Sequence, residues 1–281
     1  MKLSKKSGTT RPTGSPPGAR SKIQNILATT DLSNESIAGV RYAVALAVRV
    51  GAAVAVLHVV ELPPPPTMPG MRTITLSLQD LATAKHVRAR LKTLAKRESK
   101  SDLKLTPILR NGNSFYGIIT TARERAADLI VIATHGYTGA KRVLLGSTTE
   151  RVVRHAPCPV LTIPARTTPR RTGKMPPLDL KRILVPIDFS KTSETALPWA
   201  ASLAVEFDAE LILLHVVEKF PIDYVLGREL MNETITPLIK QSEAELKRMA
   251  ESLSKSTGLK ASEVVRDGKP FKEICSAAQK L

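Results

Sequence analysis

Short apolar runs alternate with longer amphipathic stretches along the first 164 residues of the chain. Runs of four to eight apolar residues favour buried strands, whereas apolar residues at spacings of three and four favour helices packed on one face. Between residues 35 and 50, for example, Ile37, Val40 and Val44 fall on one helical face. The predicted strands are Asn25–Thr29, Ala53–Val60, Leu103–Leu109, Leu129–Ala133 and Val160–Ile163, and the predicted helices are Glu35–Val50, Leu76–Glu98, Ser114–Ala126 and Thr148–His155.

This alternation predicts an α/β fold with an open, parallel, five-stranded, doubly wound sheet. Parallel strands joined by right-handed helical crossovers carry helices on both faces of the sheet. Both faces of each strand are then buried, which fits the abundance of Val, Ile and Leu and an aromatic content of only 4%.

The opening of this pattern occurs a second time in the chain. Asp31-Leu-Ser33 and His58 have counterparts in Asp188-Phe-Ser190 and His215, and both matches are offset by 157 positions. The second copy predicts strands at Ile183–Ile187, Glu210–Val217 and Ala261–Val265, and helices at Ser193–Phe207, Leu226–Lys255 and from Pro270 onward. The sequence reaches its last residue, Leu281, without a counterpart of residues 126–164. We therefore expect a complete first domain followed by a C-terminally incomplete second one.

Charge is concentrated outside the two copies. The formal net charge is +17, and residues 1–22 contribute six basic groups and no acidic one. Residues 165–182 contribute six basic groups against Asp179. Both stretches are rich in Pro, Gly, Ser or Thr and lack periodicity, as in disordered segments. The expected organisation is a basic tail at 1–21, a domain at 22–164, a linker at 165–180 and a second domain at 181–281. Since the domains themselves are only mildly basic, nucleic-acid binding is not expected.

The two cysteines, Cys158 and Cys275, cannot form a disulfide framework and match no metal-binding spacing. No apolar run is long enough for a membrane span, and no signal peptide is visible. We expect a cytoplasmic protein with structural thiols.

Candidate chemistry gathers where strands of the first copy end. Asp31 follows the first strand, and a glycine-rich stretch from Ala133 to Ser147 follows the fourth. Ligands of open α/β sheets bind beyond the carboxyl ends of the strands, and a helix beginning at such a loop offers N–H groups to an anion. The loop therefore indicates a phosphate site. A structural explanation is also open, because Ser147-Thr-Thr-Glu150 matches a capping box and Asp31 is a common turn residue.

No paired carboxylates, Ser/His/Asp order or Cys/His cluster indicates a catalytic centre. His58 and His215 lie on predicted buried strands, where hydrogen-bonded structural histidines are the simpler interpretation. We therefore expect hydrolytic activity to be slow or absent.

The residues together resemble the universal stress protein family. The resemblance rests on Asp31-x-Ser33, on the Leu57-His58-Val59 strand and on Ala133-Thr-His-Gly136, separated by nine residues from Gly146-Ser147-Thr148. It covers residues 22–164 and 181–281, and thus implies a tandem member with a Rossmann-like fold of the HUP type. Two positions depart from the family pattern, since Ala133 replaces a glycine and Thr29 stands where proline is common.

In the ATP-binding branch of the family, these motifs imply a nucleotide site in the first copy. The implied nucleotide-binding residues are Thr29, Asp31, Val59, Ala133, Gly136, Gly146, Ser147 and Thr148. The implied cofactor is ATP with Mg²⁺. The resemblance also implies a homodimer that pairs through Val160–Ile163.

Two functions remain open at this point. The first is an ATP-binding stress-response or regulatory protein. The second is a non-enzymatic interaction module of the same family that binds no nucleotide, an alternative that Ala133 and the incomplete second copy motivate.

Overall fold

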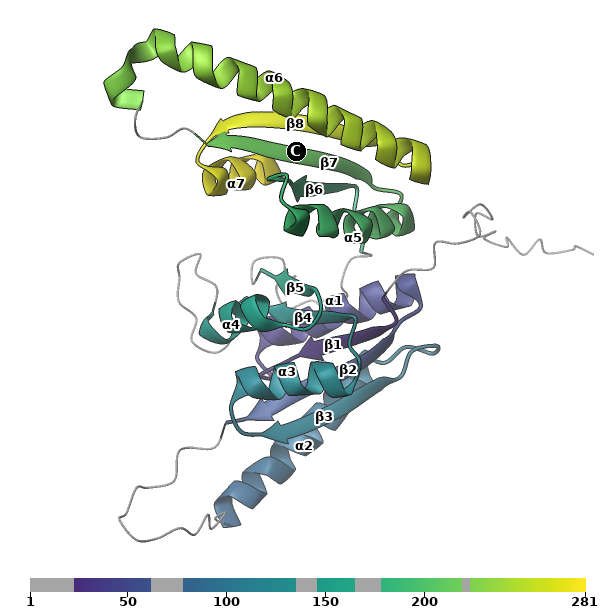
Figure 1. Ribbon diagram of the computed structural model, residues 1–281. Coiled ribbons are helices and arrows are strands. Elements are labelled where there is room, and N and C mark those ends of the chain that lie inside the picture. Colours follow the sequence, from purple (N-terminus) through teal and green to yellow (C-terminus); the bar gives the residue numbers. More distant parts are fainter. Residues whose placement is uncertain (1–22, 62–77, 135–145, 165–177, 219–222) are drawn as a thin grey trace, which may run out of the picture.

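The computed structural model describes residues 23–61, 78–134, 146–164, 178–218 and 223–281 (Figure 1). The predicted tail at 1–21, most of the predicted linker at 165–180, and Gly136 lie outside these ranges. Within them, no helix is both long enough and apolar enough to cross a membrane.

The first repeat, residues 23–164, forms a parallel sheet of five strands, as predicted. The strand order is β3-β2-β1-β4-β5, so the chain moves outward from β1 in one direction and then returns to its other side. The strands are β1 (Asn25–Thr29), β2 (Ala53–Val60), β3 (Leu105–Asn111), β4 (Leu129–Ala133) and β5 (Val160–Ile163). The helices are α1 (Asn34–Val50), α2 (Leu78–Glu98), α3 (Ser114–Glu124) and α4 (Ser147–His155).

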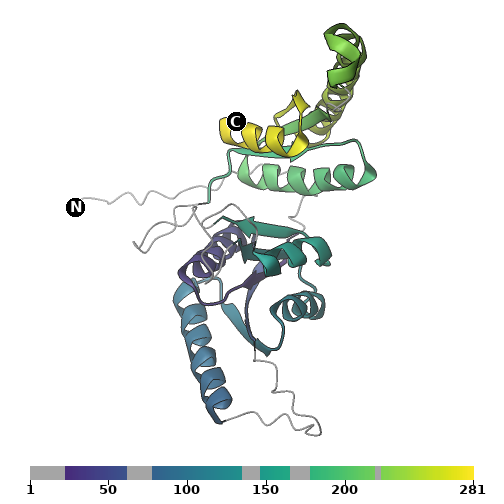
Figure 2. The same cartoon turned by 90° about the vertical axis from the view of Figure 1, so that its left-hand side faces the viewer.

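Alternate residues of each strand supply two separate cores. On β4, Val131 packs toward α1 and α2, whereas Ile130 and Ile132 pack toward α3 and α4. Figure 2 shows these two helix pairs on opposite sides of the sheet. Because the side-chain period of a strand is two, this packing fixes which residues of β4 face each helix pair.

The second repeat, residues 181–281, forms a three-stranded parallel sheet of order β6-β7-β8. Its elements are β6 (Arg182–Pro186), α5 (Lys191–Phe207), β7 (Glu210–Glu218), α6 (Asp223–Thr257), β8 (Ala261–Gly268) and α7 (Pro270–Lys280). All predicted elements are present, and four of the first repeat's strands have the predicted bounds. The largest differences on the strands are at β3, which lies two residues later at each end, and at β8, which ends three residues later than predicted.

The two repeats use the same local devices. Ser33 caps α1 by accepting a hydrogen bond from the Ser36 backbone N–H, and Ser190 caps α5 through Ser193 in the same way. His58 Nδ1 lies 2.7 Å from the carbonyl oxygen of Thr30, and His215 Nδ1 lies 2.7 Å from that of Ile187. Both half-buried imidazoles therefore have structural hydrogen-bond partners, as expected for them.

Among the described residues, the end of α1 contacts the end of α5. The Arg49 guanidinium of α1 donates two hydrogen bonds, of 3.0 and 2.7 Å, to the carbonyl oxygen of Glu206 in α5. Its carbon also lies 5.6 Å from the centre of the Phe207 ring. The end of α1 is thereby fixed to the end of α5.

The two thiols differ in environment, which predicts their reactivity. Burial raises the pKa of Cys158 to about 11, whereas Cys275 on α7 is exposed. The thiolate is the nucleophile. We therefore expect Ellman's reagent at pH 8 to react with Cys275 of the native protein at least about tenfold faster than with Cys158. Cys275→Ser should remove the fast reaction and Cys158→Ser should leave it. Equal rates in the native protein would contradict the assignment.

Candidate functional site

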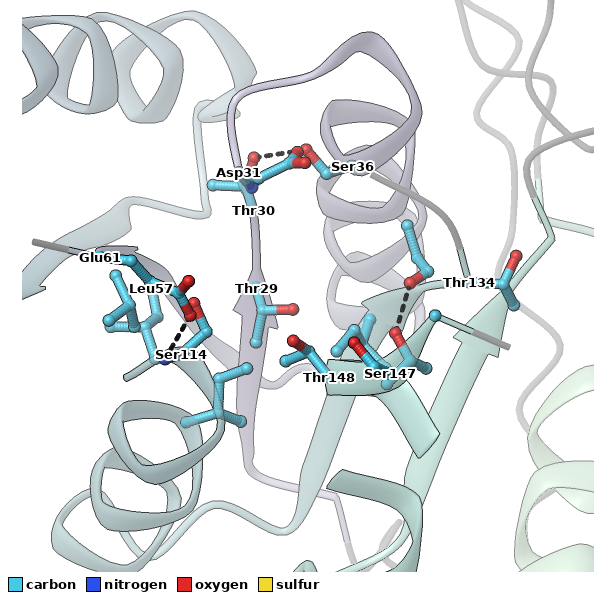
Figure 3. Close-up of a pocket in the computed structure, with 16 residues that line it drawn as sticks. Thr29, Thr30, Asp31, Ser36, Leu57, Glu61, Ser114, Thr134, Ser147 and Thr148 are labelled. Carbon is cyan, nitrogen blue, oxygen red and sulfur yellow. Dashed lines mark hydrogen bonds between the residues drawn. The ribbon is translucent and has the colours of Figure 1, made fainter. Parts of the chain in front are cut away.

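A pocket of about 350 Å³ opens at the carboxyl ends of β1, β2 and β4, where the strand order reverses (Figure 3). This is the place at which open α/β sheets bind their ligands. The structure brings seven of the eight predicted site residues to this pocket, and the eighth, Gly136, lies outside the described residues. The seven are Thr29, Asp31, Val59, Ala133, Gly146, Ser147 and Thr148.

The β1 side of the pocket is a tightly hydrogen-bonded turn. Asp31 Oδ1 accepts from the backbone N–H of Ser33 at 3.0 Å and from its hydroxyl at 2.5 Å. Thr30 is bonded through its hydroxyl to Ser36, at 2.9 Å, and through its carbonyl to His58. The predicted turn role of Asp31 is therefore present, and the same residue lines the pocket.

The β4 side is formed by the start of α4. The Gly146 N–H donates to the carbonyl oxygen of Thr134 at 2.9 Å, and the buried Thr149 hydroxyl donates to that of Ala133 at 3.0 Å. These two bonds fix the first turn of α4 against the end of β4. A Cβ on residue 146 would lie 3.1 Å from the Thr134 oxygen, so glycine permits this approach.

The capping-box interpretation of Ser147 is wrong. Gly146 is the N-cap of α4, it makes no side-chain capping bond, and Ser147 is already the first helical residue. The bond from Gly146 to Thr134 places the helix start one residue earlier than the pattern indicates. The first N–H groups of a helix have no partner within it, and here they lie at the pocket. This is the arrangement in which a helix start binds an anion.

Ala133 does not obstruct the pocket. It is not among the residues with positive φ in the described part of the chain, so its methyl group causes no backbone strain. Strand alternation directs that methyl toward α1, where a Cβ on Gly39 would lie 3.8 Å from it. The departure from the family glycine is therefore sterically tolerated at this position.

An apolar wall and a second acidic group complete the pocket, and of these residues only Val59 was predicted from the sequence. Leu57, Ile118 and Ile132 join Val59 on the side covered by α3. Glu61 follows β2, and its Oε1 accepts a hydrogen bond of 2.9 Å from the backbone N–H of Ser114 (Figure 3). The other lining residues missed are Thr30, Ser36, Ser114, Thr134 and Thr149.

Comparison with known proteins gives one consistent family. The model of the universal stress protein family matches residues 22–164 and 179–281. A universal stress protein of Methanocaldococcus jannaschii is 32% identical over 140 residues, which are 50% of this chain and 81% of that protein. A second relative, from Staphylococcus epidermidis, is 44% identical over 55 residues, which span only 29% of its length.

Solved structures agree on the fold of the whole chain. A universal stress protein from Archaeoglobus fulgidus superimposes with a TM-score of 0.61 at 22% identity, covering 91% of this chain and 81% of that one. A protein from Pseudomonas aeruginosa, described as a putative universal stress protein, gives a TM-score of 0.55 at 17% identity, with 94% and 81% covered. At these identities the similarity concerns the fold alone.

Proposed function

This chain belongs to the universal stress protein family, and we propose that its first repeat is an ATP-binding regulatory module. The observation that carries the proposal is the start of α4 at Gly146–Thr148, which faces a pocket that also has an apolar wall and Asp31. A nucleotide needs both the helix start and the apolar wall, because its phosphates are anionic and its base is flat and largely apolar.

The phosphates would lie at the start of α4. The backbone N–H groups of Ser147 and Thr148 belong to the first helical turn, and the positive end of the helix dipole adds to their attraction for an anion. The hydroxyls of the same two residues stand at this end of the pocket and can donate further hydrogen bonds. The absence of a side chain on Gly146 leaves the backbone open to close approach.

The base would occupy the opposite half, against Leu57, Val59 and Ile118. Burial of its faces on this wall provides the apolar contribution, of about 25 cal/mol per Å² of area removed from water. Asp31, at the edge of this half, is a hydrogen-bond acceptor for amino or hydroxyl groups of a nucleoside.

The size of the pocket and the composition of its lining fit such a ligand. A volume of about 350 Å³ lies within the range of small-molecule sites. The described residues contain no group of three or more His, Cys, Asp or Glu side chains able to hold a metal. We therefore propose that Mg²⁺ would arrive with the nucleotide and be held largely by its phosphates, as Mg²⁺ commonly is.

Thermal unfolding of the purified chain with increasing Mg-ATP tests the proposal. Saturable stabilisation is expected, because a ligand at 100 times its Kd adds about 2.7 kcal/mol to a folded state that alone binds it. Adenosine alone and tripolyphosphate alone should each stabilise the chain less than ATP, since each fills half of the pocket. An unfolding curve unchanged by millimolar Mg-ATP would reject the proposal and favour the interaction module.

Three further properties stay predictions. Hydrolysis is expected to be slow or absent, and the protein is expected in the cytoplasm. Two copies are expected to pair through β5, the edge strand of the first sheet. We propose that nucleotide binding changes the strength of this pairing between copies and does not lead to a chemical reaction.

A further inference from the structure

Glu61 occupies a defined place at one end of the pocket. It directly follows β2, and its Oε1 accepts from the Ser114 N–H, the first amide of α3. Hydrogen bonding to the Ser114 backbone N–H, and secondarily to the Ser114 side chain, holds the pKa of Glu61 below its ordinary value, so the carboxylate is charged at neutral pH. One carboxylate oxygen is thus held at α3, which restrains the orientation of the group at the pocket wall.

The sheet order separates this carboxylate from the proposed phosphate site. β2 and β4 lie on opposite sides of β1, and neighbouring strands are about 4.8 Å apart, which places Glu61 roughly 10 Å from the start of α4. Figure 3 shows Glu61 and Ser114 on one side of Thr29, and Ser147 and Thr148 on the other. The pocket therefore has an amide end, an apolar middle and an acidic end.

We propose that Glu61 selects the base, by accepting a hydrogen bond from the exocyclic amino group of the nucleotide. This inference rests on the proposed function. With the phosphates at α4, the ribose comes next and the base reaches farthest, toward β2. A charged carboxylate is only an acceptor, so it stabilises a donor at that edge of the base and repels a carbonyl oxygen.

Two side chains cap the start of α3, and Glu61 is bonded to only one of its amides, that of Ser114. Asn113 is the N-cap of α3, and its side-chain oxygen accepts from the Tyr116 N–H at 3.3 Å. The second repeat also has a glutamate at the end of its second strand, Glu218, although α7 begins with Pro270, which has no N–H to offer. Because the described sheet of the second repeat consists of β6, β7 and β8 and has no counterpart of β4, Glu218 serves as the matched control for Glu61.

The test compares two ligands and two variants of the full chain. The ligands are ATP and purine riboside triphosphate, which lacks only the exocyclic amino group. Glu61→Gln keeps an oxygen for the Ser114 N–H but can turn an NH₂ group toward the base. We expect Glu61→Gln to bind ATP about tenfold more weakly, the scale of a hydrogen bond to a charged group, and to bind the analogue as the unchanged chain does. Glu218→Gln, the matched control, should change neither affinity.

The other outcomes overturn the inference in distinguishable ways. An equal change for both ligands would mean that Glu61 acts on the pocket in general rather than on the amino group. A penalty that disappears with 2′-deoxy-ATP would assign the contact to the ribose. Tighter ATP binding by Glu61→Gln would show that the carboxylate only repels the phosphates. If the unchanged chain binds neither nucleotide, the proposed function fails, and this inference fails with it.

Discussion

Replacing Gly146 by valine is expected to weaken ATP binding at least about 100-fold, which corresponds to about 2.7 kcal/mol. A Cβ at this position would stand 3.1 Å from the Thr134 carbonyl oxygen, which accepts the Gly146 N–H. That oxygen is backbone and cannot swing aside, so the first turn of α4 would have to move. The amides of Ser147 and Thr148 would then lose their position at the pocket. The measurement is a fluorescence titration with a labelled ATP analogue.

Graded and distant substitutions control this experiment. Gly146→Ala adds the same close contact without the two further methyl groups, so its loss should be smaller than that of valine. Gly39→Ala adds a methyl in ordinary van der Waals contact, 3.7 Å from the Ala133 nitrogen, and should leave the Kd near the starting value. Undiminished affinity in a folded Gly146→Val protein would reject α4 as the phosphate site.

The largest effect on stability is expected for Gly117→Val. A Cβ on Gly117 would lie 2.8 Å from Cγ2 of Val59, closer than real Cβ contacts allow, and 3.2 Å from Cγ1, which is tighter than most such contacts. Valine side chains have few χ1 positions, so either Val59 moves into the pocket or α3 moves off the sheet. Overpacking of this kind costs about 1–3 kcal/mol, and the two additional methyl groups favour the upper end. Urea denaturation measures the loss.

A second substitution separates the steric cause from a general helix effect. Glycine is a poor helix former, and its replacement by alanine gains up to about 1 kcal/mol where nothing obstructs the methyl group. If contact with Val59 dominates, Val59→Ala should recover part of the stability lost in Gly117→Val, with a coupling of about 0.5–3 kcal/mol. Additive effects of the two changes, or a Gly117→Val protein as stable as the starting chain, would contradict this explanation.

The sheet of the first repeat was predictable because each of its strands is marked by a short pattern of apolar residues within the sequence itself. β1, β2 and β4 are short, mostly apolar runs, and each is followed directly by a polar residue, so their ends are visible in the sequence. β3 was placed too early because Leu103 and Leu105 are both apolar, whereas register with β2 decides which one joins the ladder. In the structure, Leu105 pairs with Val54.

The parts of the site that lie within one short stretch of sequence were predictable. The parts formed by residues far apart in the sequence were not. The Asp31 turn and the Gly146–Thr148 start are each contained within a few residues. The contact between Glu61 and Ser114 joins residues 53 positions apart, and it exists only because β2 and β3 are neighbours. No periodicity in the chain signals that pairing. The helix start at α4 was misplaced by one residue for a related reason, since the Thr134 carbonyl that accepts the Gly146 N–H belongs to the residue directly after β4.

The repetition of the aspartate turn has a consequence for interpreting related sequences. The second repeat bonds the Ser190 N–H to Asp188 Oδ1 at 3.0 Å, as Ser33 is bonded to Asp31. In both repeats the serine of this turn also caps the following helix, so the motif has a structural role that needs no ligand. In a newly determined sequence, Asp-x-Ser after a first strand should be counted as a marker of the fold, and a helix start bonded back to the fourth strand as the marker of a ligand.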